Sequence, residues 1–222
     1  MNKVELFQIY YDVQQKGRLL DGFTPHFNER ATTELESRII CEIIPGAATN
    51  SEWVGVFPWK IRSKLKRISR PRIVNHIDEN YDIITPQPNQ YPKRVKGPHF
   101  PRRQPSMEGV WPCIDMIVDK LKLSTEPVLV AKLPRIYYNA FVAKSDVYIN
   151  FVDSILKPAI DLSHEDEELN NLMMAPSEYP FDPPVRFTEH TGHKKYPWAP
   201  FVLERLINVF IELNNIKTKR TL

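Results

Sequence analysis

The sequence has few of the residues that build the best-known phosphate sites, since only seven of its 222 residues are glycine. It contains no G-x-x-x-x-G-K-[ST] segment and no G-x-G-x-x-G segment, the glycine-rich loops that bring backbone amides against phosphate. The G-x-S-x-G turn of α/β-hydrolases is missing as well. Ordinary P-loop binding and dinucleotide binding are therefore not predicted.

Cysteines and long apolar runs are also scarce. The two cysteines, Cys41 and Cys113, each lie in apolar sequence, which is typical of buried free thiols in a reducing compartment. The residues after Met1 form no signal-like apolar run, and nowhere do about 18 apolar residues follow one another. We expect a cytoplasmic protein, or one peripheral to a membrane, without a transmembrane segment.

What the chain does have is the composition of one globular domain. A hydrophobic share of 42% and a charged share of 26% suit a packed core, and the length is marginal for two domains. We expect residues 1–222 to form a single domain. The 20 prolines predict many rigid turns and extended connections.

Apolar periodicity predicts strands that alternate with helices, which is typical of an α/β sheet with helices on its faces. Long proline-rich loops are expected at 86–106 and 175–196. The predicted strands are 3–12, 53–57, 81–86, 127–133 and 136–144, and the predicted helices are 32–46, 60–68, 107–121, 145–156, 164–174 and 199–214.

The order of several segments resembles a family of small bacterial glycosyltransferase-like proteins found with cell-surface polysaccharide genes. The segments are FQIYYD, TELESRI, EWVGVFPWKIRSK, YDIITPQP, YYNAFVAKSDVYINFVDSILKPAI and PFVLERLINVFI. Such proteins are similar to nucleotide-sugar transferases of the GT-A type. The resemblance implies a single GT-A-like, Rossmann-like α/β domain that binds its donor at the carboxyl ends of the strands.

The resemblance also implies residues that bind a nucleotide-sugar donor. Asp12, at the end of the first strand, would contact the nucleoside. Lys60 and Lys64 would offset phosphate charge, and Trp59 or Tyr138 would stack on a sugar or base.

Asn139 and Lys144 would flank the strand that lines the pocket, where an amide reads sugar hydroxyls and an ammonium meets phosphate. Glu36 and Asp82 are the implied catalytic carboxylates, beside a glycan or lipid-linked acceptor. Asp78 is the candidate ligand of a divalent cation, Mn²⁺ or Mg²⁺. The sequence lacks a clear D-x-D pair, by which many GT-A enzymes hold the cation. A turn between two strands would also account for Asp78 and Asp82 without a metal.

Two other functions stay open. The basic segments 60–72 and 93–103 contain no acidic residue, and they predict nucleic-acid binding or modification as an alternative. The second alternative is a non-catalytic structural or assembly protein. Glu204 and Arg205, inside the predicted last helix, are interpreted as an ion pair that fixes this helix against the sheet.

Overall fold

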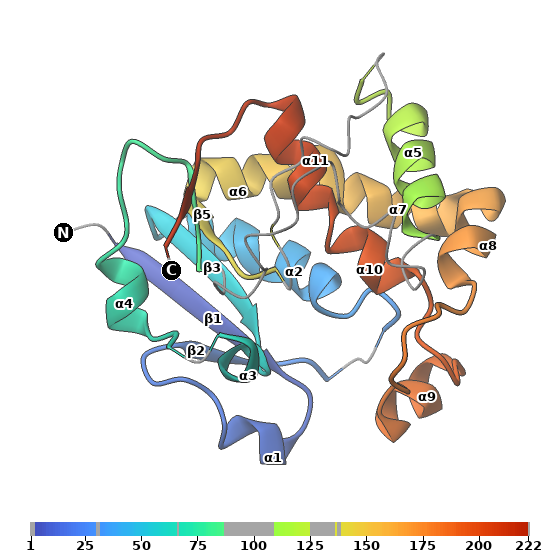
Figure 1. Cartoon of the computed structure of the whole chain (residues 1–222), viewed down its shortest axis with the longest axis horizontal. Helices are drawn as coiled ribbons and strands as arrows, with labels where there is room; N and C mark the ends of the chain where they lie inside the picture. The colour runs from blue at the N-terminus through green and yellow to red at the C-terminus, as the bar shows by residue number, and fades with distance from the viewer. Residues whose placement is uncertain are drawn as a thin grey trace, which may run out of the picture.

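The computed structural model describes residues 3–29, 32–65, 67–86, 109–124, 136 and 139–221, without the side chain of Lys64. It shows an α/β architecture in which helices surround a mixed sheet (Figure 1). The sheet has six strands in the order β2-β1-β3-β5-β4-β6. The strands are β1 (Val4–Tyr10), β2 (Thr24–Phe27), β3 (Trp53–Pro58), β4 (Ile83–Thr85), β5 (Val142–Lys144) and β6 (Thr218–Arg220). The predicted α/β class is therefore confirmed.

Five of these strands run in one direction, and β5 runs against them. β1 is parallel to β2 and β3, and β6 is parallel to β4. β5 lies between β3 and β4 and is antiparallel to both. The parallel strands end together at one edge of the sheet, which we name the carboxyl edge, and they begin at the opposite amino edge.

Helices cover both faces of the sheet (Figure 1). None of the described helices combines the length and the apolarity needed to cross a bilayer. They are α1 (Val13–Lys16), α2 (Glu36–Ala48), α3 (Ile61–Lys64), α4 (Arg70–Val74), α5 (Val110–Lys120), α6 (Ser145–Phe151), the π-helix η3 (Val152–Leu156), α7 (Lys157–Glu165), α8 (Glu167–Met174), α9 (Val185–Thr191), α10 (Ala199–Leu203) and α11 (Leu206–Leu213).

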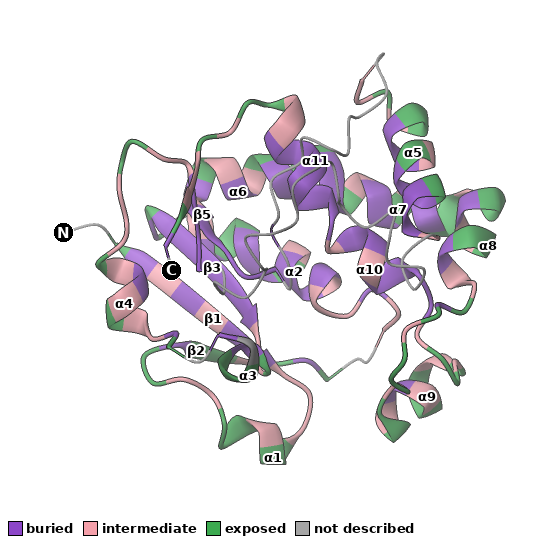
Figure 2. Cartoon of the chain, viewed as in Figure 1, coloured by how far each residue is buried: buried purple, intermediate pink, exposed green. Residues whose placement is uncertain are grey.

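Alternation along the strands separates two apolar cores, because successive side chains point to opposite faces. Ile9 and Val54 join the larger core, which contains side chains of α2, α5–α8, α10 and α11. Leu6 and Phe57 join the smaller one with α3 and α4. Figure 2 shows α11 buried, whereas α1 and α9 at the carboxyl edge stay largely exposed.

The predicted end of the first long helix at Pro45 is wrong, since α2 continues to Ala48 with Pro45 inside it. Pro45 is exposed, so its ring lies on the solvent side of the helix and outside the core. The predicted loop 86–106, beyond Pro86, and the predicted strand 127–133 lie outside the described residues.

The predicted single helix 199–214 is also wrong, because it is broken into α10 and α11 at Glu204 and Arg205. The Arg205 guanidinium donates to the carbonyl of Phe201 over 2.6 Å. In an unbroken helix the Arg205 backbone N–H would bond that carbonyl. The N–H instead donates to Val202, so the side chain of Arg205 replaces a helical hydrogen bond at the break.

Candidate functional site

A group of polar side chains gathers at the carboxyl edge, where β1 and β2 end and α2 begins. Tyr11 follows the last residue of β1, and Asn28 follows the last residue of β2. The Asn28 backbone N–H donates to the Tyr10 carbonyl over 2.8 Å, which fixes the two strand ends side by side. Glu36 is the first residue of α2. The fold therefore brings together three residues from three separate segments.

Glu36 and Tyr11 influence each other's protonation. Burial is the main cause that raises the pKa of the Glu36 carboxyl, and the charge of Glu204 adds to it, while Tyr11 and Lys60 act to lower it. Burial, followed by the Glu36 charge, raises the pKa of the Tyr11 hydroxyl well above its ordinary value. A carboxyl with a raised pKa is a better proton acceptor than an ordinary one.

A projecting segment, residues 176–197, adds a second aromatic residue to the group. We name it the arm, and it contains α9 (Figure 1). Burial and then the Glu36 charge raise the pKa of Tyr196, near the end of the arm, to about 12. The charge of Glu36 therefore reaches Tyr196 on the arm.

Arg186, on α9, fastens the arm to the strand ends. Its guanidinium donates to the carbonyl of Tyr11 and, over 2.9 Å, to the carbonyl of Glu29. The same group lies 5.5 Å from the ring centre of Phe27, within the range of a cation–π contact. One side chain thus connects the arm to the ends of β1 and β2.

Trp59 and Lys60 follow directly after β3 at the same edge. The Lys60 ammonium lies 5.2 Å from the centre of the Trp59 ring, and the Arg18 guanidinium lies 6.0 Å from it. The buried Gln8 amide donates to the Trp59 carbonyl over 3.3 Å. The turn after β3 therefore presents a partly exposed aromatic ring with two cations beside it, one of which acts on Glu36.

Asp12 and Asn139 lie at the carboxyl edge too, but their contacts are structural. Asp12 caps α1, since its carboxylate accepts the backbone N–H of Gln15 over 2.9 Å and the Gln15 side-chain amide over 2.7 Å. Asn139 precedes β5 with a φ of 50°, in the left-handed region that asparagine tolerates best among residues with a side chain. It is 7% exposed.

Lys144, Asp82 and Asp78 lie at the amino edge, away from Glu36. The Lys144 ammonium donates to Asp82 over 3.1 Å and to the carbonyl of Glu79 over 3.0 Å. Lys219 donates to Asp78 over 2.8 Å, and this bond is the main cause that lowers the pKa of the Asp78 carboxyl. The structure therefore separates the predicted carboxylates Glu36 and Asp82.

The residues around Asp78 do not fit a divalent cation. Its carboxylate is engaged by an ammonium, and it also accepts hydrogen bonds from Asn80. Within the described ranges, no three or more His, Cys, Asp or Glu side chains gather as metal ligands. Two other predicted positions, the Lys64 side chain and Tyr138, lie outside the described residues.

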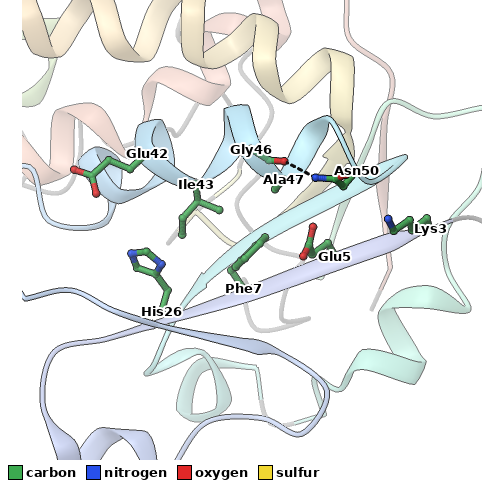
Figure 3. Close-up of a pocket in the computed structure, with 9 residues that line it drawn as sticks. All are labelled: Lys3, Glu5, Phe7, His26, Glu42, Ile43, Gly46, Ala47 and Asn50. Atoms are coloured by element: carbon green, nitrogen blue, oxygen red, sulfur yellow. Dashed lines mark hydrogen bonds between the residues drawn. The ribbon is translucent and has the colours of Figure 1, made fainter.

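Two hollows lie away from the polar group. One of about 480 Å³ lies between α2 and the strands β1 and β2, where Phe7 and His26 face Glu42 and Ile43 (Figure 3). The other, of about 670 Å³, lies at the amino edge beside Lys144. Among the described residues, Lys144 is the only predicted site residue that lines either hollow. Its ammonium is held by Asp82, and the polar group at the carboxyl edge lines neither hollow.

Sequence reasoning missed Asn28, Tyr196 and Arg186, and it did not assign Tyr11. A weak signal existed for Tyr11, which precedes Asp12 at the end of a predicted strand. Asn28 follows a short strand that the sequence did not reveal. Tyr196 and Arg186 reach the site through contacts with residues far away in the chain, which no local pattern indicates.

Comparison of the chain with family models, with curated proteins and with solved structures gives no match. The resemblance to glycosyltransferase-like proteins remains a prediction.

Proposed function

We propose that this protein is a glycosyltransferase that moves a sugar from a nucleotide-sugar donor to a glycan or lipid-linked acceptor. The observation that carries the proposal is the Glu36 carboxyl, which has a raised pKa and lies at the carboxyl edge among Tyr11, Tyr196 and Lys60. The carboxyl ends of parallel strands are the usual ligand site of open α/β sheets. A sheet of five parallel strands and one antiparallel strand supports a GT-A-like fold as part of the proposal.

In the proposed reaction Glu36 is the general base. Its carboxylate takes the proton of an acceptor hydroxyl, and the hydroxyl oxygen forms a bond to the anomeric carbon of the donor sugar. The bond between that carbon and the phosphate oxygen breaks, and the nucleoside diphosphate leaves with the electron pair. The Lys60 ammonium and the Arg18 guanidinium offset its charge.

Trp59 has the role of a stacking surface for the donor. Its ring is partly exposed, and the two cations beside it place positive charge where a diphosphate would follow a stacked base. Asp12 and Asn139 shape the edge through the α1 cap and the turn before β5. Asp82, Lys144 and Asp78 take no part in the proposed step, because they lie at the amino edge.

The first test is thermal unfolding with UDP-glucose, UDP-galactose, UDP-N-acetylglucosamine and GDP-mannose, with and without Mn²⁺ or Mg²⁺. A ligand at about 100 times its dissociation constant stabilises the folded state by roughly 2.7 kcal/mol. A selective rise with one nucleotide sugar supports the proposal. No rise with any donor contradicts it, and salt-dependent binding of DNA or RNA would then be measured.

The second test measures release of nucleoside diphosphate with simple alkyl glycosides as acceptors. Glu36→Gln should lower the rate by about 10² to 10⁴ and leave donor binding intact. Glu42→Gln is the matched control, since Glu42 is exposed on the same helix and pairs with Arg38 at 3.5 Å. Equal rates for Glu36→Gln and the wild type would show that Glu36 is not the general base.

A further inference from the structure

Positive charge is concentrated on one stretch of the chain. Seven of the residues 59–72 are Lys or Arg, and none is acidic. These seven charges exceed the net charge of +3 of the whole chain, so the remaining residues are acidic on balance. The stretch comprises the turn after β3, α3 and the start of α4. A surface of one charge sign attracts partners of the opposite sign.

The loop between α1 and β2 adds cations to this stretch, and two side chains fasten the two segments together. Oε1 of the buried Gln8 accepts the backbone N–H of Leu20 over 2.7 Å, while its Nε2 donates to the Trp59 carbonyl. The Arg70 guanidinium donates to the carbonyl of Gly22 over 3.2 Å. The two segments therefore form one fixed surface.

The cations of this surface face solvent and are not neutralised. Five exposed side chains form what we name the basic face: Lys16, Arg18, Lys60, Arg62 and Arg67. Among the described residues, none of the five forms an ion pair with a carboxylate. Four lysines elsewhere in the chain do form one, namely Lys120, Lys144, Lys195 and Lys219. The basic face therefore keeps its charge for a partner.

The surroundings of the basic face favour a membrane over a nucleic acid. A single strand of nucleic acid is usually held in a groove with a row of aromatic rings, but neither of the two hollows described above is lined by a residue of this face. Val13, at the start of α1, is 82% exposed and lies on the same short helix as Lys16. An exposed aliphatic side chain and the partly exposed Trp59 among cations are typical of a segment that rests on a bilayer.

We propose that the basic face docks on a membrane surface of anionic phospholipids, with Val13 in the headgroup layer and the cations on lipid phosphates. Lys60 of this face acts on Glu36, so docking brings Glu36 near the membrane. One consequence rests on the proposed function: the acceptor is lipid-linked, because the head of such a lipid lies at the surface on which the protein docks.

The test is flotation with vesicles of phosphatidylcholine, with and without phosphatidylglycerol, in the absence of a donor. The wild type should bind the anionic vesicles, less at high salt, and not the neutral ones. Arg62→Gln combined with Arg67→Gln should weaken binding about 25-fold, because each cation near an anionic surface contributes about fivefold. Lys122→Gln combined with Lys157→Gln is the matched control, since both lysines are exposed and α5 and α7 lie on the other side of the molecule from α3 (Figure 1).

Val13→Ser tests the contact with the headgroup layer. It should weaken binding to anionic vesicles about tenfold, the contribution of one buried valine side chain. Unchanged binding of this variant would overturn the proposal, and so would equal weakening in the control pair or no binding of the wild type. Release of the protein from the vesicles by DNA at equal phosphate concentration would also overturn it, since the basic face would then prefer nucleic acid.

The docking face and the proposed function can fail separately. Vesicle binding needs no donor, so a protein that binds anionic vesicles but no nucleotide sugar keeps the docking face and contradicts the transferase. A protein that binds a nucleotide sugar but no vesicles keeps the transferase and overturns the docking face.

Discussion

The Asp82 carboxylate joins three segments at the amino edge of the sheet. One of its oxygens accepts from the Lys144 ammonium over 3.1 Å, and the other accepts the backbone N–H of Lys217 over 3.0 Å. It thereby connects the start of β4 with the end of β5 and with the residue before β6. These bonds give Asp82 a structural role at the edge opposite Glu36.

Replacement of Asp82 should therefore affect stability and leave transfer intact. Asp82→Ala removes both hydrogen bonds, and we expect the free energy of unfolding to fall by about 1 kcal/mol, since the pair is partly exposed. Urea unfolding measures this change. If a folded Asp82→Asn variant loses more than about tenfold in transfer rate, Asp82 takes part in the reaction.

Glu36→Gln should change the pH dependence of stability. A carboxyl whose pKa is raised in the folded state binds its proton more tightly there than in the unfolded chain. Stability is therefore lost as pH rises from the unfolded value, about 4.3, through the folded value. The amide of the variant does not titrate and has no such loss. The variant should be more stable than the wild type at pH 7, and this difference should shrink toward pH 4 in thermal unfolding.

Trp59 should contribute to donor affinity through its ring. Trp59→Ala should weaken binding of the nucleotide sugar by about tenfold, the size of a stacking contact of roughly 1–3 kcal/mol. Trp59→Phe should recover part of the loss because a smaller ring still stacks. If Trp59→Ala and the wild type bind the donor equally in calorimetry, the ring only covers the turn after β3.

Asn208 should contribute to stability through Ile136. Its Oδ1 accepts the backbone N–H of Ile136 over 2.8 Å, and its Nδ2 donates to the Ile136 carbonyl over 3.1 Å. Asn208→Ala removes both bonds from buried backbone groups, and we expect a loss of about 2 kcal/mol in the free energy of unfolding. Urea unfolding measures this loss, and an unchanged free energy would show that the two bonds add nothing to stability.

Arg186 should control the mobility of the arm. Arg186→Met keeps the length of the side chain but removes the donors to Tyr11 and Glu29. We expect faster backbone hydrogen exchange in residues 176–197, while the strands of the sheet keep their protection. Unchanged exchange in the arm would mean that its aromatic contacts, such as Phe187 with Tyr196 at 5.2 Å, hold it alone.

Sequence patterns predicted the elements that are buried, since apolar periodicity reports burial. β1, β3, β4 and α2 follow this rule. β2 was missed because it is an edge strand, TPHF, whose side chains are mostly exposed. α9 was missed inside a segment that its prolines mark as a loop. The short, polar β6 gave no signal either.

The direction of β5 explains why the predicted site was divided. The sequence prediction placed Asn139 and Lys144 together beside one pocket. β5 is antiparallel to its neighbours, so it begins near Asn139 at the carboxyl edge and ends with Lys144 at the amino edge. Glu36, Trp59 and Lys60 lie together at the carboxyl edge, where Trp59 and Lys60 follow the end of the parallel strand β3 and Glu36 begins α2. Strand direction depends on long-range pairing, which a local pattern does not contain.

The arm begins and ends at one place on the body of the protein. Pro176 lies opposite Pro197, with the Ser177 N–H bonded to the Tyr196 carbonyl over 2.8 Å and the Trp198 N–H bonded to the Ala175 carbonyl over 3.1 Å. Because its ends are held together, the segment between them can change in length or sequence without altering the spacing of α8 and α10. The arm is thus an exchangeable segment, whose sequence can vary while the body of the protein keeps its geometry.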